Sequence, residues 1–145
     1  MARYRGTIES VRSQADTFAY MADFSNVAEW DPTAAEARHL GEGEPALGSR
    51  FHVRVHWLGR DIELEYEITE IDAPHRLVLR AENATTISED TVEVVARGEG
   101  SEVTYDAQVT LKGLVRVADP LLGLAFKRLG DNATAGLRRV LSNPA

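Results

Sequence analysis

The segment that most constrains the fold is the last long one, Asp119 to Leu141, whose apolar residues keep helical spacing for five or six turns. Asp119 and Pro120 have the form of an N-cap followed by proline at the first helical position. Charged residues occupy most of the other faces, which predicts an amphipathic helix lying on a core. The apolar stripe consists of Leu122, Phe126, Leu129, Ala133, Leu137 and Val140.

Between Thr33 and Gly113 the pattern becomes strand-like and is interrupted by clusters of turn residues. In Ser49 to Leu58, apolar residues alternate with Arg and His, and in residues 61–69 they alternate mostly with Asp and Glu. We therefore predict a β-hairpin whose basic outer row faces an acidic one. Further strands are expected at Tyr4 to Val11, Ala34 to Leu40, Arg76 to Asn83, Thr85 to Arg97 and Val103 to Leu111.

Two short helices are predicted between the first strand and the others. Ser13 and Asp16 have the spacing of a capping box and precede apolar residues at helical intervals. A second helical piece is expected from Ser25 to about Glu29, and Asp31-Pro32 should end it, because proline pushes the preceding residue to extended geometry. The predicted class is therefore α+β, with a curved antiparallel sheet wrapped around the long C-terminal helix.

Length and composition limit the kinds of protein to consider. A chain of 145 residues is expected to form a single domain, 1–145. It contains no cysteine, which excludes disulfides, thiolate metal sites and a cysteine nucleophile. A formal net charge of −7 argues against a nucleic-acid binder, which needs a basic face. No apolar run approaches the roughly 20 residues of a membrane span, and the start lacks the apolar core of a secretory signal, so we expect no integral membrane association and a cytoplasmic location.

Three short motifs occur in a familiar order along this layout. They are FSNVAEWDP at Phe24 to Pro32, GSRF at Gly48 to Phe51, and DAPHRL at Asp72 to Leu77. In their order the chain resembles, over essentially its whole length, the polyketide cyclase/dehydrase-like branch of the START or Bet v 1-like (SRPBCC) superfamily. The resemblance implies a helix-grip fold: a seven-stranded antiparallel sheet curled around the last helix, with an apolar cavity closed by the two short helices. It implies no single chemistry, since members include lipid and hormone carriers, polyketide cyclases and quinone-binding proteins.

Aromatic residues dominate the faces assigned to the interior, and a cavity lined by them would suit a flat or elongated apolar ligand. For any one of these residues ordinary core packing is the more common role, but as a group they favour ligand contact. The predicted ligand-binding residues are Trp30, Trp57, Tyr66, Asn83, Asp90, Tyr105, Leu122 and Phe126.

Few polar residues are candidates for chemistry inside such a cavity. Asp90 points inward if its strand keeps the phase of Val92, and Asn83 shares the phase of Leu79. A carboxylate there would have a raised pKa and could act as a general acid or base. The alternative is a bulge or frayed strand end that turns Asp90 to solvent. Asp90, Asn83 and Tyr105 are therefore weak catalytic candidates.

No metal or cofactor is expected. His52 and His56 have an H-x-x-x-H spacing that suits a shared zinc ion only on a helix. On a strand the two side chains lie roughly 13 Å apart, given a rise near 3.3 Å per residue. A shared metal is therefore implausible, and no histidine falls on an interior phase that would support a serine-histidine-acid arrangement.

Three functions remain open from the sequence. The first is a small-molecule-binding protein whose internal cavity holds a hydrophobic or aromatic ligand, such as a lipid, a polyketide-like compound or a quinone. The second is a cyclase or dehydratase on the same scaffold, with one of the three polar candidates polarising the substrate. The third is a protein-interaction module that uses the charged outer face of the sheet or the elbow at Phe24 to Trp30. The identity of the ligand and the oligomeric state stay open.

Overall fold

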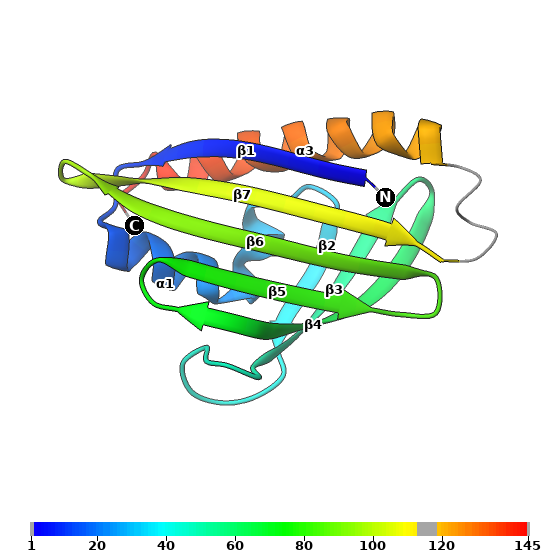
Figure 1. The fold of residues 1–145 in the computed structure, drawn as a ribbon, viewed down its shortest axis with the longest axis horizontal. Coiled ribbons are helices and arrows are strands. Elements are labelled where there is room, and N and C mark those ends of the chain that lie inside the picture. The colour runs from blue at the N-terminus through cyan, green and yellow to red at the C-terminus, as the bar shows by residue number, and fades with distance from the viewer. Residues whose placement is uncertain (1, 113–118, 145) are drawn as a thin grey trace.

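The computed structural model describes residues 2–112 and 119–144, with side chains for 2–112 and 123–144. These residues form one antiparallel sheet, a long C-terminal helix and short helices after the first strand (Figure 1). In chain order the elements are β1 (Ala2–Ser10), α1 (Gln14–Ala22), the 3-10 turn η1 (Phe24–Asn26), α2 (Val27–Trp30), β2 (Ala34–His39), β3 (Arg50–Trp57), β4 (Arg60–Asp72), β5 (Arg76–Glu82), β6 (Thr86–Arg97), β7 (Gly100–Leu111) and α3 (Asp119–Leu141).

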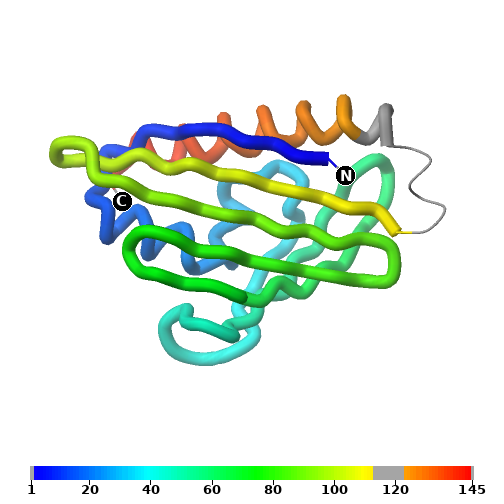
Figure 2. The backbone as a smooth tube through the Cα atoms, viewed as in Figure 1, coloured from blue at the N-terminus to red at the C-terminus, as the bar shows by residue number. Residues whose placement is uncertain are grey.

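The sheet has seven strands in the order β1-β7-β6-β5-β4-β3-β2. Each strand from β2 to β7 therefore pairs with its neighbours in sequence, whereas β1 joins the sheet at the far edge, beside β7. The sheet curls, and α3 runs along β1 (Figures 1 and 2). The predicted α+β helix-grip architecture is confirmed.

Helix α3 has the predicted extent, and the residues of the predicted stripe whose side chains the structure describes, all but Leu122, are buried or partly buried. Phe126, Ala133 and Leu137 are buried, and Leu129 and Val140 are partly buried against the core. The helix begins at Asp119, but the N-cap role of Asp119-Pro120 depends on side chains outside the described residues. No helix within residues 2–112 and 119–144 is long and apolar enough to cross a membrane.

The predicted capping residue begins the first short helix, and the predicted Asp31-Pro32 pair ends the second. The Ser13 side chain accepts a hydrogen bond from the Asp16 backbone N–H at 3.1 Å, which caps α1. Asp31 has extended backbone angles, φ −98° and ψ 111°, and ends α2 before Pro32. Phe24, Val27 and Trp30 are each 3% exposed, so the elbow that contains them belongs to the core.

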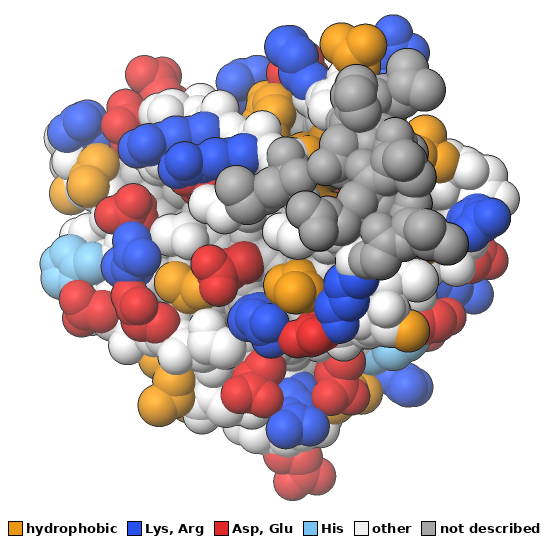
Figure 3. Space-filling model, turned by 45° about the vertical axis from the view of Figure 1, so that its right-hand side comes forward, with side chains coloured by type: hydrophobic (Ala, Val, Ile, Leu, Met, Phe, Trp, Pro, Cys, Tyr) orange, Lys and Arg blue, Asp and Glu red, His pale blue; other side chains and the backbone are white. Residues whose placement is uncertain are grey.

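The β3–β4 hairpin has the predicted register, because basic residues of one strand face acidic residues of the other. The cross-strand pairs are Arg50 with Glu67, His52 with Glu65, Arg54 with Glu63, and His56 with Asp61. Among the side chains, Arg50 contacts both Glu65 and Glu67, and His56 contacts Asp61; these groups are largely solvent-exposed, so each contact contributes at most about 1 kcal/mol. On the molecular face shown in Figure 3, basic and acidic side chains are likewise interspersed.

Candidate functional site

The inner face of the sheet and helix α3 enclose a cavity with a volume of about 120 Å³. Small residues line this space, among them Ala107 on β7 and Ala133 on α3, while Gly130 on α3 lets the Tyr4 ring pack directly against the helix, because a Cβ there would lie 2.3 Å from that ring. The wall is mainly apolar and aromatic. It is formed by Tyr4, Trp30, Asp31, Thr33, Val55, Trp57, Ile62, Leu64, Tyr66, Thr86, Ser88, Asp90, Tyr105, Ala107, Val109, Leu111, Phe126, Leu129, Gly130, Ala133 and Thr134.

The aromatic residues predicted for the site all line this cavity. Trp30 and Tyr105 meet edge to face, with ring centroids 5.4 Å apart and planes at 80°. Trp57 and Phe126 form a similar pair at 6.2 Å and 66°. The hydroxyl of Tyr66 is hydrogen-bonded to the Ser88 hydroxyl at 2.9 Å, deep in the protein. The wall is therefore held in place by specific ring and hydroxyl contacts.

Asp90 is the central polar group of the cavity and is only 4% exposed. Strand β6 stays regular through this position, where Asp90 pairs with Ala107 of β7, so the alternative of a bulge that turns Asp90 to solvent is wrong. The Tyr105 hydroxyl donates a hydrogen bond to Oδ2 of Asp90. Burial, together with the negative charge of nearby carboxylates, raises the pKa of Asp90 to about 7, against the opposing effect of the Tyr105 hydrogen bond.

Asp31 supplies a second carboxyl to the same cavity. Its Oδ1 accepts hydrogen bonds from the Thr33 backbone N–H at 2.9 Å and the Thr33 hydroxyl at 2.8 Å. Burial raises the pKa of Asp31 above its usual value, and its charge contributes to the raised pKa of Asp90. From its sequence context Asp31 is expected only to end a helix, so its place in the cavity was missed.

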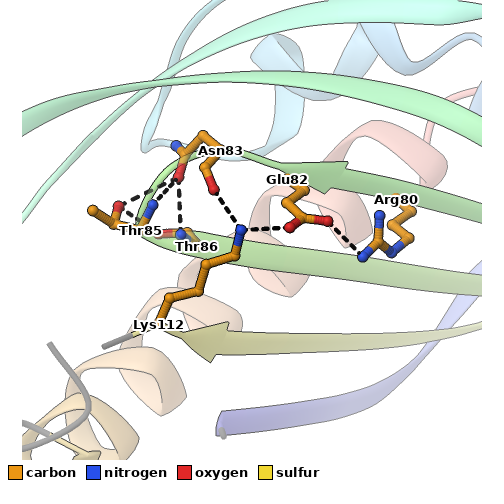
Figure 4. Close-up of polar contacts among 6 residues, drawn as sticks. All are labelled: Arg80, Glu82, Asn83, Thr85, Thr86 and Lys112. Atoms are coloured by element: carbon orange, nitrogen blue, oxygen red, sulfur yellow. Dashed lines mark hydrogen bonds and ion pairs between the residues drawn. The ribbon is translucent and has the colours of Figure 1, made fainter. Parts of the chain in front are cut away.

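Asn83 does not lie in the cavity, and its predicted inward position is wrong. Strand β5 ends at Glu82, one residue earlier than its alternation suggested. The Asn83 side-chain oxygen accepts hydrogen bonds from the backbone N–H groups of Thr85 and Thr86, both at 2.9 Å (Figure 4). Its amide nitrogen donates to the Glu63 carbonyl at 3.3 Å. Asn83 therefore stabilises the β5–β6 turn and is removed from the catalytic and ligand-binding candidates.

Three further positions singled out in the sequence do not add to the described cavity wall. Leu122 lies in α3, but its side chain is outside the described residues. His52 and His56 lie on the outer side of the β3–β4 hairpin, where they pair with Glu63 and Asp61, respectively. Within the part of the chain that the structure describes, no group of three or more His, Asp or Glu side chains could hold a metal ion.

The site thus combines an apolar, aromatic wall with a buried carboxyl–phenol pair. A carboxyl with a pKa of about 7 can give or accept a proton near neutral pH, where general acid–base catalysis is most effective. The phenol of Tyr105, whose pKa burial raises well above 10, stays protonated and serves as a hydrogen-bond donor. The cavity can therefore bind rings and can polarise or deprotonate one polar group beside them.

Comparisons with known proteins agree with this architecture. Residues 1–142 match the family described as "Polyketide cyclase / dehydrase and lipid transport". No curated protein matches the sequence with significance. A START superfamily protein from Mycobacterium smegmatis has a similar structure, with a TM-score of 0.79, 14% identity and 97% of each chain covered. TTHA0849 from Thermus thermophilus is similar at a TM-score of 0.76 and 13% identity, with 97% of this chain and 95% of that chain covered.

A third similar structure is a two-domain protein. The di-domain ARO/CYC BexL from the BE-7585A biosynthetic pathway has a TM-score of 0.69 and 14% identity, and the match covers 99% of this chain and 50% of BexL. At these low identities the structural likeness shows the fold and no particular activity. The match over residues 1–142, together with the helix-grip fold, shows that this chain belongs to the polyketide cyclase/dehydrase and lipid transport family.

Proposed function

We propose that this protein binds a small hydrophobic or aromatic molecule in the cavity between α3 and the sheet. The observation that carries the proposal is the wall itself: aromatic side chains surround a space that contains the Asp90–Tyr105 pair as its polar anchor. The ligand's ring would pack against Trp30, Trp57 and Phe126. Its polar group would reach Asp90. Lipid and polyketide-like molecules are the ligand classes that the family description supports, and the aromatic wall would also suit a quinone-like ring.

The size of the cavity indicates how much of a ligand it takes up. A dry cavity of roughly 150 Å³ accepts benzene, whereas pockets for drug-sized ligands span roughly 300–1,000 Å³. At about 120 Å³, this cavity suits one ring, either a whole small molecule or the end of a larger one. Burial of about 150 Å² of ring surface contributes about 4 kcal/mol before the cost of immobilising the ligand, so a bare single-ring probe should bind only weakly.

The direct test combines native mass spectrometry of the purified protein with ligand-detected NMR, using benzyl alcohol as the probe. We expect a co-purifying apolar molecule or binding of benzyl alcohol, and we expect Ala107→Leu to abolish that binding by filling the cavity. Gln108→Leu, on the opposite face of the same strand, is the matched control and should leave binding unchanged. Absence of any bound compound together with absence of probe binding would overturn the proposal, as would probe binding that survives Ala107→Leu.

A second candidate function, proton transfer in a cyclase or dehydratase reaction, is favoured by one observation. Asp90 has a pKa of about 7 and touches both the cavity and a neutral phenol donor. In such a reaction the Asp90 carboxylate would remove a proton from the carbon next to a substrate carbonyl. The Tyr105 hydroxyl lies beside it and could turn to donate to the developing oxyanion.

This enzymatic candidate has its own test. Acetophenone in D₂O exchanges its methyl protons slowly, and the protein should accelerate that exchange if Asp90 removes a proton from bound ketone. Asp90→Asn should lose the acceleration while acetophenone still binds, which separates chemistry from affinity. If the wild-type protein exchanges the protons no faster than buffer does, or if Asp90→Asn exchanges them equally fast, the enzymatic candidate fails and ligand binding stands alone.

The third possibility, a protein-interaction module, would be favoured by a collapsed interior without a continuous pocket. The presence of the cavity therefore favours ligand binding over docking as the main role. Phe24, Val27 and Trp30 are buried in the core, so these side chains are not available to a partner protein.

A further inference from the structure

We infer that the cavity selects ring-bearing amines, with the ammonium group held by the carboxyls of Asp31 and Asp90 and the ring packed against the aromatic wall. This inference rests on the proposed function, because it concerns the ligand class of the same cavity. It separates amines from the neutral and anionic ring compounds that would fit the space equally well.

The first argument is the charge of the lining. Asp31 and Asp90 are both part of the wall, and no Lys, Arg or His lies among the lining residues that the structure describes. The charge of Asp31 acts on Asp90 and on the phenols of Tyr66 and Tyr105, so the acidic groups share one electrostatic environment. A carboxylate ligand would add a further negative charge there with no cation to balance it.

The second argument is the supply of hydrogen-bond acceptors. Tyr105 donates to Oδ2 of Asp90, and Thr33 donates twice to Oδ1 of Asp31. The remaining oxygen of each carboxyl has no donor among the described residues of the chain. An ammonium group has three donors and no acceptor, so it complements these two oxygens, whereas a carboxylate ligand would bring only acceptors.

The third argument is that aromatic side chains surround the two carboxyl groups. Trp30 immediately precedes Asp31, and its ring meets the ring of Tyr105, which in turn bonds to Asp90. Indole and phenol faces attract cations within about 6 Å, most strongly where water is excluded. The same residues that pack a ring can therefore also stabilise a charge beside it, and this combination of carboxyls and rings recognises an amine better than a neutral alcohol.

The preference for amines should increase as the pH rises, because binding of the ammonium group is linked to loss of the Asp90 proton. The groups that act on Asp90 are Tyr105 by its hydrogen bond, and Asp31, Asp106 and Glu89 by their negative charge. A bound cation favours the ionised carboxylate, so amine binding should release protons near pH 7 and tighten as Asp90 ionises. Affinity for a neutral ring compound should change little over the same pH range.

The experiment compares three probes of matched size at about pH 8, one unit above the pKa of Asp90. The probes are benzylamine, benzyl alcohol and benzoate. Their binding to the wild-type protein is measured by ligand-detected NMR. We expect benzylamine to bind roughly tenfold more tightly than benzyl alcohol, and benzoate not to bind. Asp31→Asn and Asp90→Asn should each remove most of the amine preference while benzyl alcohol still binds. Glu93→Gln, on the outward side of β6 and not among the groups that act on Asp90, is the matched control and should keep the preference.

Surface binding of a cation to an acidic protein is separated from cavity binding by Ala107→Leu, which should abolish the benzylamine signal. If that signal persists, or if benzyl alcohol or benzoate binds as tightly as benzylamine, the amine inference is overturned while ligand binding itself stands. If none of the three probes binds, the amine inference is overturned, and if no compound co-purifies with the protein either, the proposed function is overturned as well. Retention of the preference in both aspartate variants also contradicts the inference.

Discussion

The Tyr105 hydroxyl donates a hydrogen bond to Oδ2 of Asp90, and both side chains are buried on the inner faces of the paired strands β7 and β6. Asp90 pairs directly with Ala107, two residues beyond Tyr105, so the bond runs diagonally across the two strands. The small side chain of Ala107 leaves the carboxyl open to the cavity. The Asp90–Tyr105 hydrogen bond therefore defines the polar part of the site, and it partly offsets the burial that raises the pKa of Asp90.

Replacement of Asp90 by Asn should stabilise the protein most at high pH. Burial raises the pKa of Asp90 from 3.8 to about 7, so the folded state holds a proton that the unfolded chain has lost. The stabilisation that this proton provides is complete below about pH 4 and is lost as the pH rises through about 7, with an upper limit of about 4 kcal/mol. The free energy of unfolding of Asp90→Asn, measured with urea, should exceed that of wild type by a margin that grows from pH 5 to pH 8. A margin independent of pH would contradict the raised pKa.

Replacement of Tyr105 by Phe should raise the pKa of Asp90 above its value of about 7. The Tyr105 hydrogen bond lowers that pKa, whereas burial, which raises it, is retained in the variant. The carboxyl carbon of Asp90, followed by NMR in protein labelled at aspartate, reports the change directly. Tyr66→Phe is the control, because the Tyr66 hydroxyl bonds to Ser88 and not to Asp90. Equal Asp90 titrations in wild type and Tyr105→Phe would show that the hydrogen bond is not formed.

Much of the fold follows from sequence because its elements carry strong periodic signals. The β3–β4 register is visible as a basic row and an acidic row, and the α3 stripe is visible as spacing of three and four. The inward position of Asp90 follows from the unbroken alternation of β6. These features depend on local pattern alone, which is why they could be predicted before any coordinates.

The errors at the site also have physical causes. Extending the alternation of β5 by one residue predicts an inward Asn83, but an Asx turn takes over after the last strand residue. Asp31 carries the local signal of a helix end, whereas its place in the wall depends on how α2 packs against α3. Strand β1 alternates only loosely, so its pattern does not mark Tyr4 as a wall residue; Tyr4 reaches the wall because β1 lies against α3. Contacts between distant segments carry no local signal.

Replacement of Gly136 by Ala should destabilise the protein although alanine favours helices. A Cβ at position 136 would lie 2.0 Å from the Trp30 carbonyl oxygen, so α3 would have to move away from α2. We expect a loss of about 1–3 kcal/mol in the free energy of unfolding, measured by urea denaturation. Gly123→Ala on the same helix is the matched control. A Cβ there meets nothing within 4 Å, so helix propensity alone should stabilise this variant by up to about 1 kcal/mol. Equal effects of the two substitutions would mean that α3 and α2 are not in close contact.

Replacement of Thr17 by Val should weaken the junction of β1, α1 and β7. The Thr17 hydroxyl is fully buried and lies 2.8 Å from the hydroxyls of both Ser10 and Ser101. Valine has nearly the same shape but removes the shared oxygen, which leaves buried hydroxyls short of a partner at a cost of about 1–3 kcal/mol. Thr91→Val, on the outward side of β6, is the control and should be within about 0.5 kcal/mol of wild type. Urea denaturation of the two variants gives the comparison, and a Thr17→Val variant as stable as the control would show that the hydroxyl cluster contributes only shape to the core.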